Sequence, residues 1–284
     1  MEFDRMTGTV RNINQRFFSS KTNPHLTIRT TSSSLQSYKA HSHSELSIGI
    51  LLSGSTCLSL PTGQTVLQAG DAVIIEPNMV HACNPIAETP RSYYMLYVDN
   101  EWCCNVLSAL YGYKVTQLTC DHKHLSCSDV TSDLTDSVCS LLENESKQSA
   151  LEIDNHLFYL LSHYCSPSYP LKSDDLLAVN VRERLLEDIS YSLSLDAISQ
   201  QLGRPTESLI RAFKRRFGIT PKSFLNNHRV EKAKALLKCG MNIVDVAAEV
   251  GFSDQSQLHR AFVSYTASTP RQYQQGASIF DNNC

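Results

Sequence analysis

One motif occurs twice in the last third of the chain. LIRAFKRRFGITP starts at Leu209 and LHRAFVSYTASTP starts at Leu258, and both read L-x-R-A-F with Thr-Pro seven residues after the Phe. Each copy follows an apolar helical pattern and a glycine, LDAISQQLG before the first and IVDVAAEVGF before the second. A short helix, a glycine turn and a second helix with Arg on its open face is the pattern of a helix-turn-helix. The repeat predicts two such units in an all-α C-terminal domain.

The second helix of each unit is predicted to have one apolar and one polar face. Leu209 and Phe213, and likewise Leu258 and Phe262, are spaced i, i+4 and share a face that suits a core. The opposite face carries side chains that can bind bases or phosphates, since Arg suits guanine, Gln suits adenine, and Ser or His suits either. These candidates are Glu207, Ser208, Arg211, Lys214 and Arg215 in the first unit, and Gln255, Ser256, Gln257, His259 and Arg260 in the second.

The segment between the two copies, PKSFLNNHRVEKAKALLKCG, has helical periodicity and predicts one long helix that ends at Gly240. Such a rod would present the two units to successive faces of the major groove, roughly 34 Å apart. The alternative is a helical bundle whose polar faces are only solvated. Two copies with matching core and Arg positions favour a duplex DNA partner over that alternative.

Charge is distributed unevenly along the chain. The 284 residues carry a net charge of −3, yet Asn180–Gln275 holds 14 Lys and Arg against 9 Asp and Glu. A basic C-terminal segment beside an acidic remainder fits one domain that meets a polyanion and one that does not. No apolar run approaches the roughly 20 residues of a membrane span, and the polar N-terminus lacks a secretory signal, so we expect a cytoplasmic protein with no membrane partner. The ten cysteines lack CxxC and zinc-finger spacings, which predicts free thiols.

The rest of the chain indicates a strand-rich domain followed by helices. Short apolar stretches over residues 24–100, bounded by turn residues, predict a β-barrel or sandwich. The pattern becomes helical over Asp129–Tyr164, with a polar break at ENESKQSA. SPSYPLKSDD (residues 166–175) is typical of a linker.

Residues from about Val181 to Gln275 resemble the DNA-binding domain of AraC/XylS-type transcription regulators. The features that match are both repeats, the joining helix and the TPRQY that follows. The resemblance implies that eight of these helix positions face bases: Glu207, Ile210, Arg211, Gln255, Ser256, Gln257, His259 and Arg260. One position of the first unit departs from the family pattern. Pro205 stands where a Ser often caps the first recognition helix, so Thr206 would cap it or Pro205 would open its first turn. In the second unit we expect Ser253 as the N-cap.

The N-terminal strands resemble the cupin-like sensor domain common in that family, with HSHSE and GDAVIIEPNMVHACN as landmarks. We therefore expect a two-domain α+β protein, with a cupin-like β-barrel and accessory helices ahead of two helix-turn-helix units joined by a long helix. The expected domains are 1–128 for ligand sensing, 129–165 for helical dimerisation or packing, 166–178 as linker, and 179–276 for DNA binding.

His41, His43, Glu45 and His81 are the candidate ligand-binding residues of the N-terminal domain. Imidazole and carboxylate donors suit several transition metals. However, Leu46, Ile48, Ile50 and Leu52 take the opposite strand parity, so the histidines would face outward if that stripe lined the barrel. Metal binding, contact with a small organic ligand and a purely structural role all remain open, and no cofactor is expected.

These features predict a ligand-responsive, sequence-specific transcription regulator, an activator rather than an enzyme. Its expected partners are duplex DNA, a small-molecule effector, a second copy in a homodimer, and RNA polymerase. Two rivals remain. One is a cupin dioxygenase or isomerase with metal at the histidines, and the other is a constitutive DNA-binding protein whose barrel only dimerises.

Overall fold

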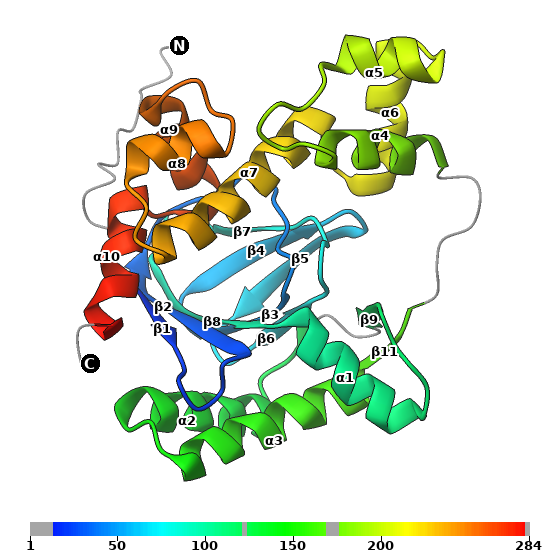
Figure 1. Cartoon of the computed structure of the whole chain (residues 1–284). Helices are drawn as coiled ribbons and strands as arrows, with labels where there is room; N and C mark the ends of the chain where they lie inside the picture. The colour runs from blue at the N-terminus through cyan, green and yellow to red at the C-terminus, as the bar shows by residue number, and fades with distance from the viewer. Residues whose placement is uncertain (1–13, 121–123, 169–175, 282–284) are drawn as a thin grey trace.

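The computed structural model describes residues 14–120, 124–168 and 176–281, with side chains described as far as Gln275. Part of the expected linker, residues 169–175, lies outside these ranges, as do residues 1–13 of the expected sensing domain. The order of elements along the chain is as expected. Strands come first, helices follow, and the last third is helical throughout (Figure 1).

The N-terminal strands form two larger antiparallel sheets and one small one. The six-stranded sheet has the order β1 (Gln15–Ser19), β2 (Leu26–Ser34), β8 (Arg91–Val98), β3 (Leu46–Ser53), β6 (Ala72–Ile75), β10 (His124–Leu125). The three-stranded sheet has the order β5 (Gly63–Gln68), β4 (Ser55–Leu60), β7 (Ala82–Pro85). A third sheet pairs β9 (Leu118–Cys120) with β11 (Cys165–Pro167).

The two-domain α+β architecture is confirmed, but the described strands pair as separate sheets rather than as one closed barrel. The chain leaves the six-stranded sheet between β3 and β4. The register of β3 with β8 shifts between Leu51 and Ser53, and Gly54 follows with a φ of +79°. Only a glycine fits there, because a Cβ would lie 2.4 Å from the Pro90 carbonyl oxygen. This bulge and turn direct β4 into the second sheet.

The six-stranded sheet is covered on both faces. On one face pack α1 (Asn100–Tyr111), α2 (Asp129–Glu143) and α3 (Lys147–Tyr164), whose buried Leu107, Leu134 and Leu157 join Ile48 of β3 in one core. A smaller apolar cluster, including Leu51, lies on the opposite face toward the three-stranded sheet. The helices that were expected to serve dimerisation or packing therefore pack on the sheet of their own chain (Figure 1).

The C-terminal region holds seven described helices, α4 (Leu176–Leu186), α5 (Leu195–Leu202), α6 (Thr206–Phe217), α7 (Pro221–Lys238), α8 (Ile243–Glu249), α9 (Gln255–Thr266) and α10 (Pro270–Asp281). The pairs α5–α6 and α8–α9 are the two expected helix-turn-helix units, and α7 runs between them (Figure 1). Each unit has its own apolar core, and the N-terminal domain adds a side chain to both: Val80 to the core with α6, and Phe17 to the core with α9.

Within the described ranges, none of the helices combines the length and apolar character that a bilayer span requires. The nine cysteines in these ranges are free thiols, as the spacing predicts.

Candidate functional site

The second helices of the two units, α6 and α9, each bury one face and expose the other. Leu209, Phe213, Leu258 and Phe262 are fully buried, as the repeat predicts. Most of the residues expected to bind DNA are exposed, namely Glu207, Arg211, Lys214, Arg215, Gln255, Ser256, Gln257, His259 and Arg260. Ser208 and Ile210 are half-buried, and Ser208 lines a groove against Leu177 and Asn180 of α4. Arg211 and Arg260 hold equivalent positions in their helices.

Both capping predictions are wrong. Asp254, not Ser253, caps α9, because the Asp254 carboxylate accepts the Gln257 backbone N–H at 2.7 Å, while the Ser253 hydroxyl donates to that carboxylate at 3.2 Å. Pro205 occupies the N-cap of α6 without a side-chain bond, and Thr206 begins the helix. The Thr206 hydroxyl instead donates to Asp196 of α5 at 2.8 Å, which ties the two helices of this unit together.

The joining helix α7 contains 18 residues, a length of about 27 Å at 1.5 Å per residue. It contacts α4, α6 of the first unit, and α8 and α9 of the second. Cys239 caps it and Gly240 follows with a φ of +81°, so the helix stops where the sequence predicts. The two exposed faces are thus held by one rigid element.

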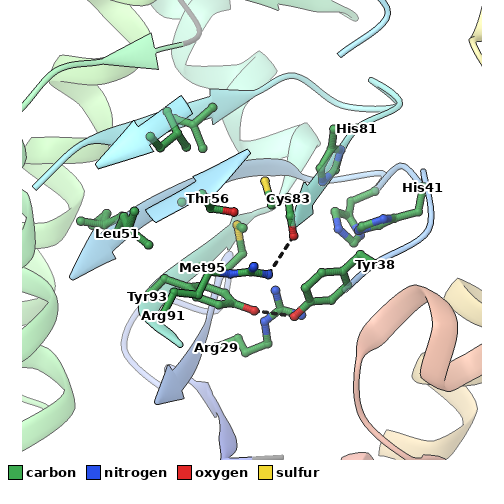
Figure 2. A pocket seen from close by; sticks show the side chains of 15 residues that line it. Arg29, Tyr38, His41, Leu51, Thr56, His81, Cys83, Arg91, Tyr93 and Met95 are labelled. Carbon is green, nitrogen blue, oxygen red and sulfur yellow. Dashed lines mark hydrogen bonds between the residues drawn. The ribbon is translucent and has the colours of Figure 1, made fainter. Parts of the chain in front are cut away.

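A second candidate site is a cavity of about 40 Å³ between the two sheets of the N-terminal domain, which has room for a few water molecules. One wall is apolar and includes Leu51, Leu67, Val73 and Met95. The polar side chains that line it are Arg29, Tyr38, His41, His43, Thr56, His81, Cys83, Arg91 and Tyr93 (Figure 2).

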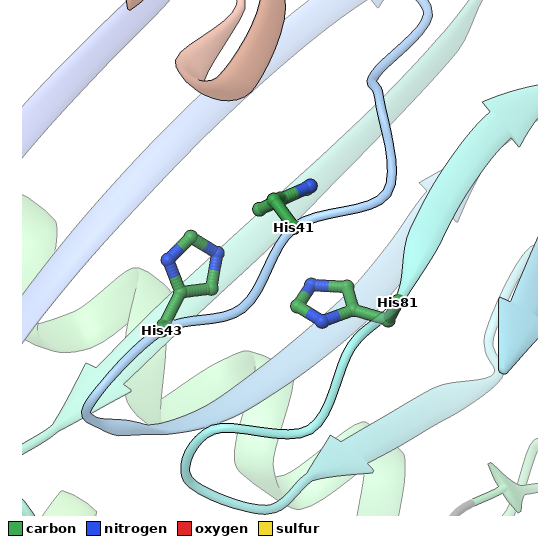
Figure 3. Close-up of side chains that lie close together, drawn as sticks. All are labelled: His41, His43 and His81. Carbon is green, nitrogen blue, oxygen red and sulfur yellow. The ribbon is translucent and has the colours of Figure 1, made fainter. Parts of the chain in front are cut away.

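His41, His43 and His81 meet at one end of this cavity. All three are buried, and one ring nitrogen of each lies within 4.8 Å of the others (Figure 3). Nδ1 of His41 donates to the Lys39 carbonyl at 2.6 Å, and Nδ1 of His81 donates to the Met79 carbonyl at 3.0 Å. Because a carbonyl only accepts, Nε2 of each of these two neutral rings carries a lone pair.

The outward orientation suggested by strand parity is wrong. His41 and His43 precede β3, and His41 forms an isolated bridge with His81. The stripe of Leu46, Ile48 and Ile50 packs against α1–α3 on the outer face of the sheet, so the opposite parity faces the cavity. Alternation could not reveal this, because both faces of β3 are buried.

Glu45 does not join the histidines. It is half-buried and lines a different cavity, at the boundary between the domains, with Glu231, Lys234 and Lys238 of α7. The expected four-residue ligand set is therefore divided between two places.

Burial lowers the pKa of all three histidines, and the positive charge of Arg29 lowers it further. For His81 the pKa falls to about 4. The rings are consequently neutral at pH 7 and offer donors that suit a transition metal. Against a dication stand the nearby Arg29 charge and the absence of any carboxylate from the cluster within the described residues. The geometry alone does not identify a metal site.

Arg29 and Arg91 were not anticipated from the sequence, although both line the cavity and are nearly inaccessible, with exposed fractions of 6% and 1%. Arg91 donates to the carbonyl oxygens of Gln36 and Cys83 at 3.0 and 2.8 Å. The usable signal was the alternation of LTIRTT. It places Arg29 on the face opposite Leu26 and Ile28.

The segment that forms the histidine end of the cavity, residues 36–43, also contacts the C-terminal helices. Asn227 of α7 donates to the Ser42 carbonyl at 2.7 Å, and Lys39 N–H donates to the Ser264 carbonyl of α9 at 3.1 Å. His43 Nδ1 lies 3.4 Å from a Glu231 carboxylate oxygen. His259 and Arg260 line a groove with residues 36–39. No sequence pattern predicted these contacts.

Two protein-family models match the chain. A helix-turn-helix domain model matches residues 198–276, and the model of the AraC-like ligand binding domain matches residues 23–161. The chain is 28% identical over 236 residues to the uncharacterized HTH-type transcriptional regulator YbfI of Bacillus subtilis, covering 79% of this chain and 82% of the relative. It is 28% identical over 107 residues to the HTH-type transcriptional activator RhaS of Escherichia coli, a match that spans 37% of each protein.

Solved structures of ToxT from Vibrio cholerae share the fold. ToxT of strain O395 superposes with a TM-score of 0.54 at 14% identity, covering 94% of this chain and 98% of that one. The unsaturated fatty acid-bound ToxT of strain SCE256 gives a TM-score of 0.54 at 16% identity, covering 93% and 96%. The two family matches together span most of the chain and fall on the domain with the cavity and on the helices α5–α10. The chain therefore belongs to the AraC family of transcription regulators, with an AraC-like ligand-binding domain ahead of its helix-turn-helix DNA-binding domain.

Proposed function

We propose that this regulator binds a specific duplex sequence through α6 and α9, and that an effector in the N-terminal cavity changes this binding and activates transcription. The observation that carries the proposal is that residues 36–43 belong both to the cavity wall and to the contact between the two domains. This segment lines the cavity and also contacts α7 and α9 through Ser42 and Lys39. The activator role is supported by the similarity to RhaS, which is a transcriptional activator.

In this proposal the exposed faces of α6 and α9 enter successive major grooves. Arg211 and Arg260 read guanines, and Gln255, Ser256, Gln257 and His259 contact neighbouring bases or phosphates. Glu207 reads a cytosine amino group, and Ser208 and Ile210 contribute from the half-buried edge of the helix. Lys214 and Arg215, in the last turns of α6, bind phosphates.

The conformation described here is the one that opposes DNA binding. His259 and Arg260 lie beside residues 36–39, and a duplex seated on α9 has to displace this segment. The effector acts by weakening the contacts of Arg29, Lys39 and Ser42 with the C-terminal helices. It shifts the chain toward a state in which α9 is free.

We further propose the domain limits 1–128, 129–165, 166–178 and 179–276, a homodimer, contact with RNA polymerase, and a cytoplasmic location. The exposed apolar side chains of α3, Leu151 and Phe158, are 55% and 46% exposed and offer a surface for the second copy. The family leaves no role for a cupin enzyme, and constitutive DNA binding is the rival that an experiment has to exclude.

Selection from a random duplex library with the full chain tests DNA recognition. The expected product contains two short motifs about one helical turn apart, because α7 separates the two helices by about that length. Failure of any sequence to be enriched overturns the proposal. A duplex bound equally well whatever small molecules are present supports constitutive binding instead.

A further inference from the structure

Two arginines in the N-terminal cavity have unsatisfied hydrogen-bond donors. Nε of Arg29 and Nη1 of Arg91 are buried without a hydrogen-bond partner among the described residues. Within the same residues, no carboxylate lies within 4.0 Å of either guanidinium, since the ion pairs found there all involve other side chains. Buried polar groups are nearly always paired, so donors of this kind inside a cavity point to a missing acceptor.

The side chains that line the cavity do not supply a negative charge, since none of them is a carboxylate. The guanidinium group stays protonated at all ordinary pH values. Burial lowers the pKa of His41 and His81, and it raises that of Tyr38 and, to about 11, that of Cys83. At pH 7 these neighbours are therefore neutral.

Aromatic rings compensate part of this charge. The Arg29 guanidinium carbon lies 5.5 and 5.6 Å from the ring centres of Tyr38 and Tyr93, and that of Arg91 lies 6.0 and 5.5 Å from the same two rings. The Tyr38 and Tyr93 hydroxyls are hydrogen-bonded to each other (Figure 2). Cation–π contact does not satisfy Nε of Arg29 or Nη1 of Arg91, because it uses the face of each guanidinium while the N–H groups point outward in the guanidinium plane.

From this arrangement we infer that the cavity binds a small carboxylate, whose oxygens accept hydrogen bonds from Arg29 and Arg91. The planar guanidinium matches a carboxylate in geometry and charge. The inference rests on the proposed function, because it takes this cavity as the effector site. The cavity volume of about 40 Å³ limits the ligand to a compact acid of a few carbon atoms.

Binding of this kind reaches the DNA-binding helices through Arg29. Nη1 of Arg29 donates at 3.4 Å to the carbonyl of Thr266, the last residue of α9. A carboxylate is a stronger acceptor than this carbonyl, so the ligand competes with α9 for the same guanidinium. The ligand is thereby linked to release of the helix that carries Arg260.

Calorimetric titration of the full chain with acetate, lactate and succinate tests the inference, and lactamide and succinamide serve as uncharged controls. At least one acid is expected to bind while its amide does not. Arg91→Gln and Arg29→Gln should each weaken that binding by about 10- to 100-fold, the effect of losing a charged hydrogen bond. Arg91→Lys should retain part of it. Arg184→Gln on α4, which removes an exposed charge outside the cavity, should leave it unchanged.

Circular dichroism and the thermal midpoint of each variant without ligand establish that it is folded. If a variant fails to fold, the comparison of acids with amides on the wild-type chain still decides the question. Binding of the amides as well as the acids overturns the inference, as does a midpoint that rises with Zn²⁺ or Mn²⁺ but with none of the acids. In either case the proposed function stands if selected duplexes are still bound in an effector-dependent way. It fails separately if no duplex is selected.

Discussion

Arg29 of β2 donates a hydrogen bond across the domain boundary to the carbonyl oxygen of Thr266, which ends α9. The guanidinium thus lies between the internal cavity and the C-terminal end of the second recognition helix. A cation at this end of a helix is favourable, because the helix dipole places partial negative charge there. The bond connects the candidate effector site to a candidate DNA-reading element with no intervening residue.

Replacing Arg260 by Ala should relax base preference at one position of the selected duplex and cost about 1–3 kcal/mol there. Arg211→Ala should do the same in the other half of the site. Competition binding with duplexes substituted at single positions measures both effects. Arg184→Ala, an exposed arginine on α4, is the matched control. A uniform loss on every sequence would make Arg260 a phosphate contact instead.

Lys214→Ala is expected to behave differently from the two arginine variants. A phosphate contact adds affinity without sequence information, so binding should weaken equally on all duplexes. The slope of log affinity against log salt should become shallower by about 0.9, the counterions released by one phosphate contact. Fluorescence anisotropy between low and moderate salt gives this slope. An unchanged slope excludes Lys214 from the interface.

Folding stability should fall as the pH drops below about 6.5. The folded-state pKa of His81 is about 4, well below the ordinary value of 6.5, because of burial and the charge of Arg29. Between pH 6.5 and pH 4, His81 binds a proton in the unfolded chain but stays neutral in the folded chain. The loss is about 2 kcal/mol at pH 5 for this residue alone. His41 and His43 act in the same direction, with Lys234 and Arg29 also opposing protonation of His43.

Denaturant unfolding from pH 8 to pH 5 measures this loss. Above about pH 7.5 these histidines should contribute almost no slope, because they are then neutral in both the folded and the unfolded state. His81→Gln should reduce the slope below pH 6.5. A slope identical in the variant and the wild-type chain would contradict the assignment of a buried, neutral His81.

Gly251→Ala should destabilise the second helix-turn-helix unit far more than Gly203→Ala destabilises the first. Both glycines have positive φ, +84° and +59°, which costs an alanine about 1–2 kcal/mol. A Cβ on Gly251 would also lie 2.3 Å from the Ser190 carbonyl oxygen, whereas one on Gly203 meets nothing within 4 Å. Urea unfolding compares the two, and equal midpoints would disprove the close contact of the α8–α9 turn with Ser190.

Phe158→Glu tests the proposed homodimer. Phe158 is 46% exposed on α3, and a charge there should convert a wild-type dimer to monomer in sedimentation velocity. Leu110→Glu, at an exposed position on α1, should leave the dimer intact. A wild-type chain that sediments as a monomer excludes the dimer. If neither change disrupts the dimer, its interface lies on a surface other than α3.

The helices of the C-terminal region were predictable because their signals are local. The spacing of Leu209 and Phe213 identifies a buried face, and Gly240 marks the end of α7, whatever the rest of the chain does. The cavity was not predictable in this way. The orientation of His41 depends on α1–α3 covering the outer face of β3, and Arg29 matters because two sheets enclose it.

Contacts between the domains were beyond prediction for a similar reason. Asn227 lies within the 18-residue helix α7, and nothing in the neighbouring sequence indicates that it contacts the Ser42 carbonyl. The family resemblance gave the domain order, but it did not give the pairing of residues 36–43 with α7 and α9.

The most direct test of the account is the affinity of the ligand-free chain for its selected duplex after Asn227→Ala. This substitution removes the 2.7 Å bond to Ser42 and leaves the exposed faces of α6 and α9 unchanged. Because the bond holds α7 on the cavity wall, its loss should raise the affinity by about two- to tenfold. Asn226→Ala, next to it on a half-exposed part of the helix, should bind like the wild-type chain. Equal affinity in all three would contradict control of DNA binding by this contact.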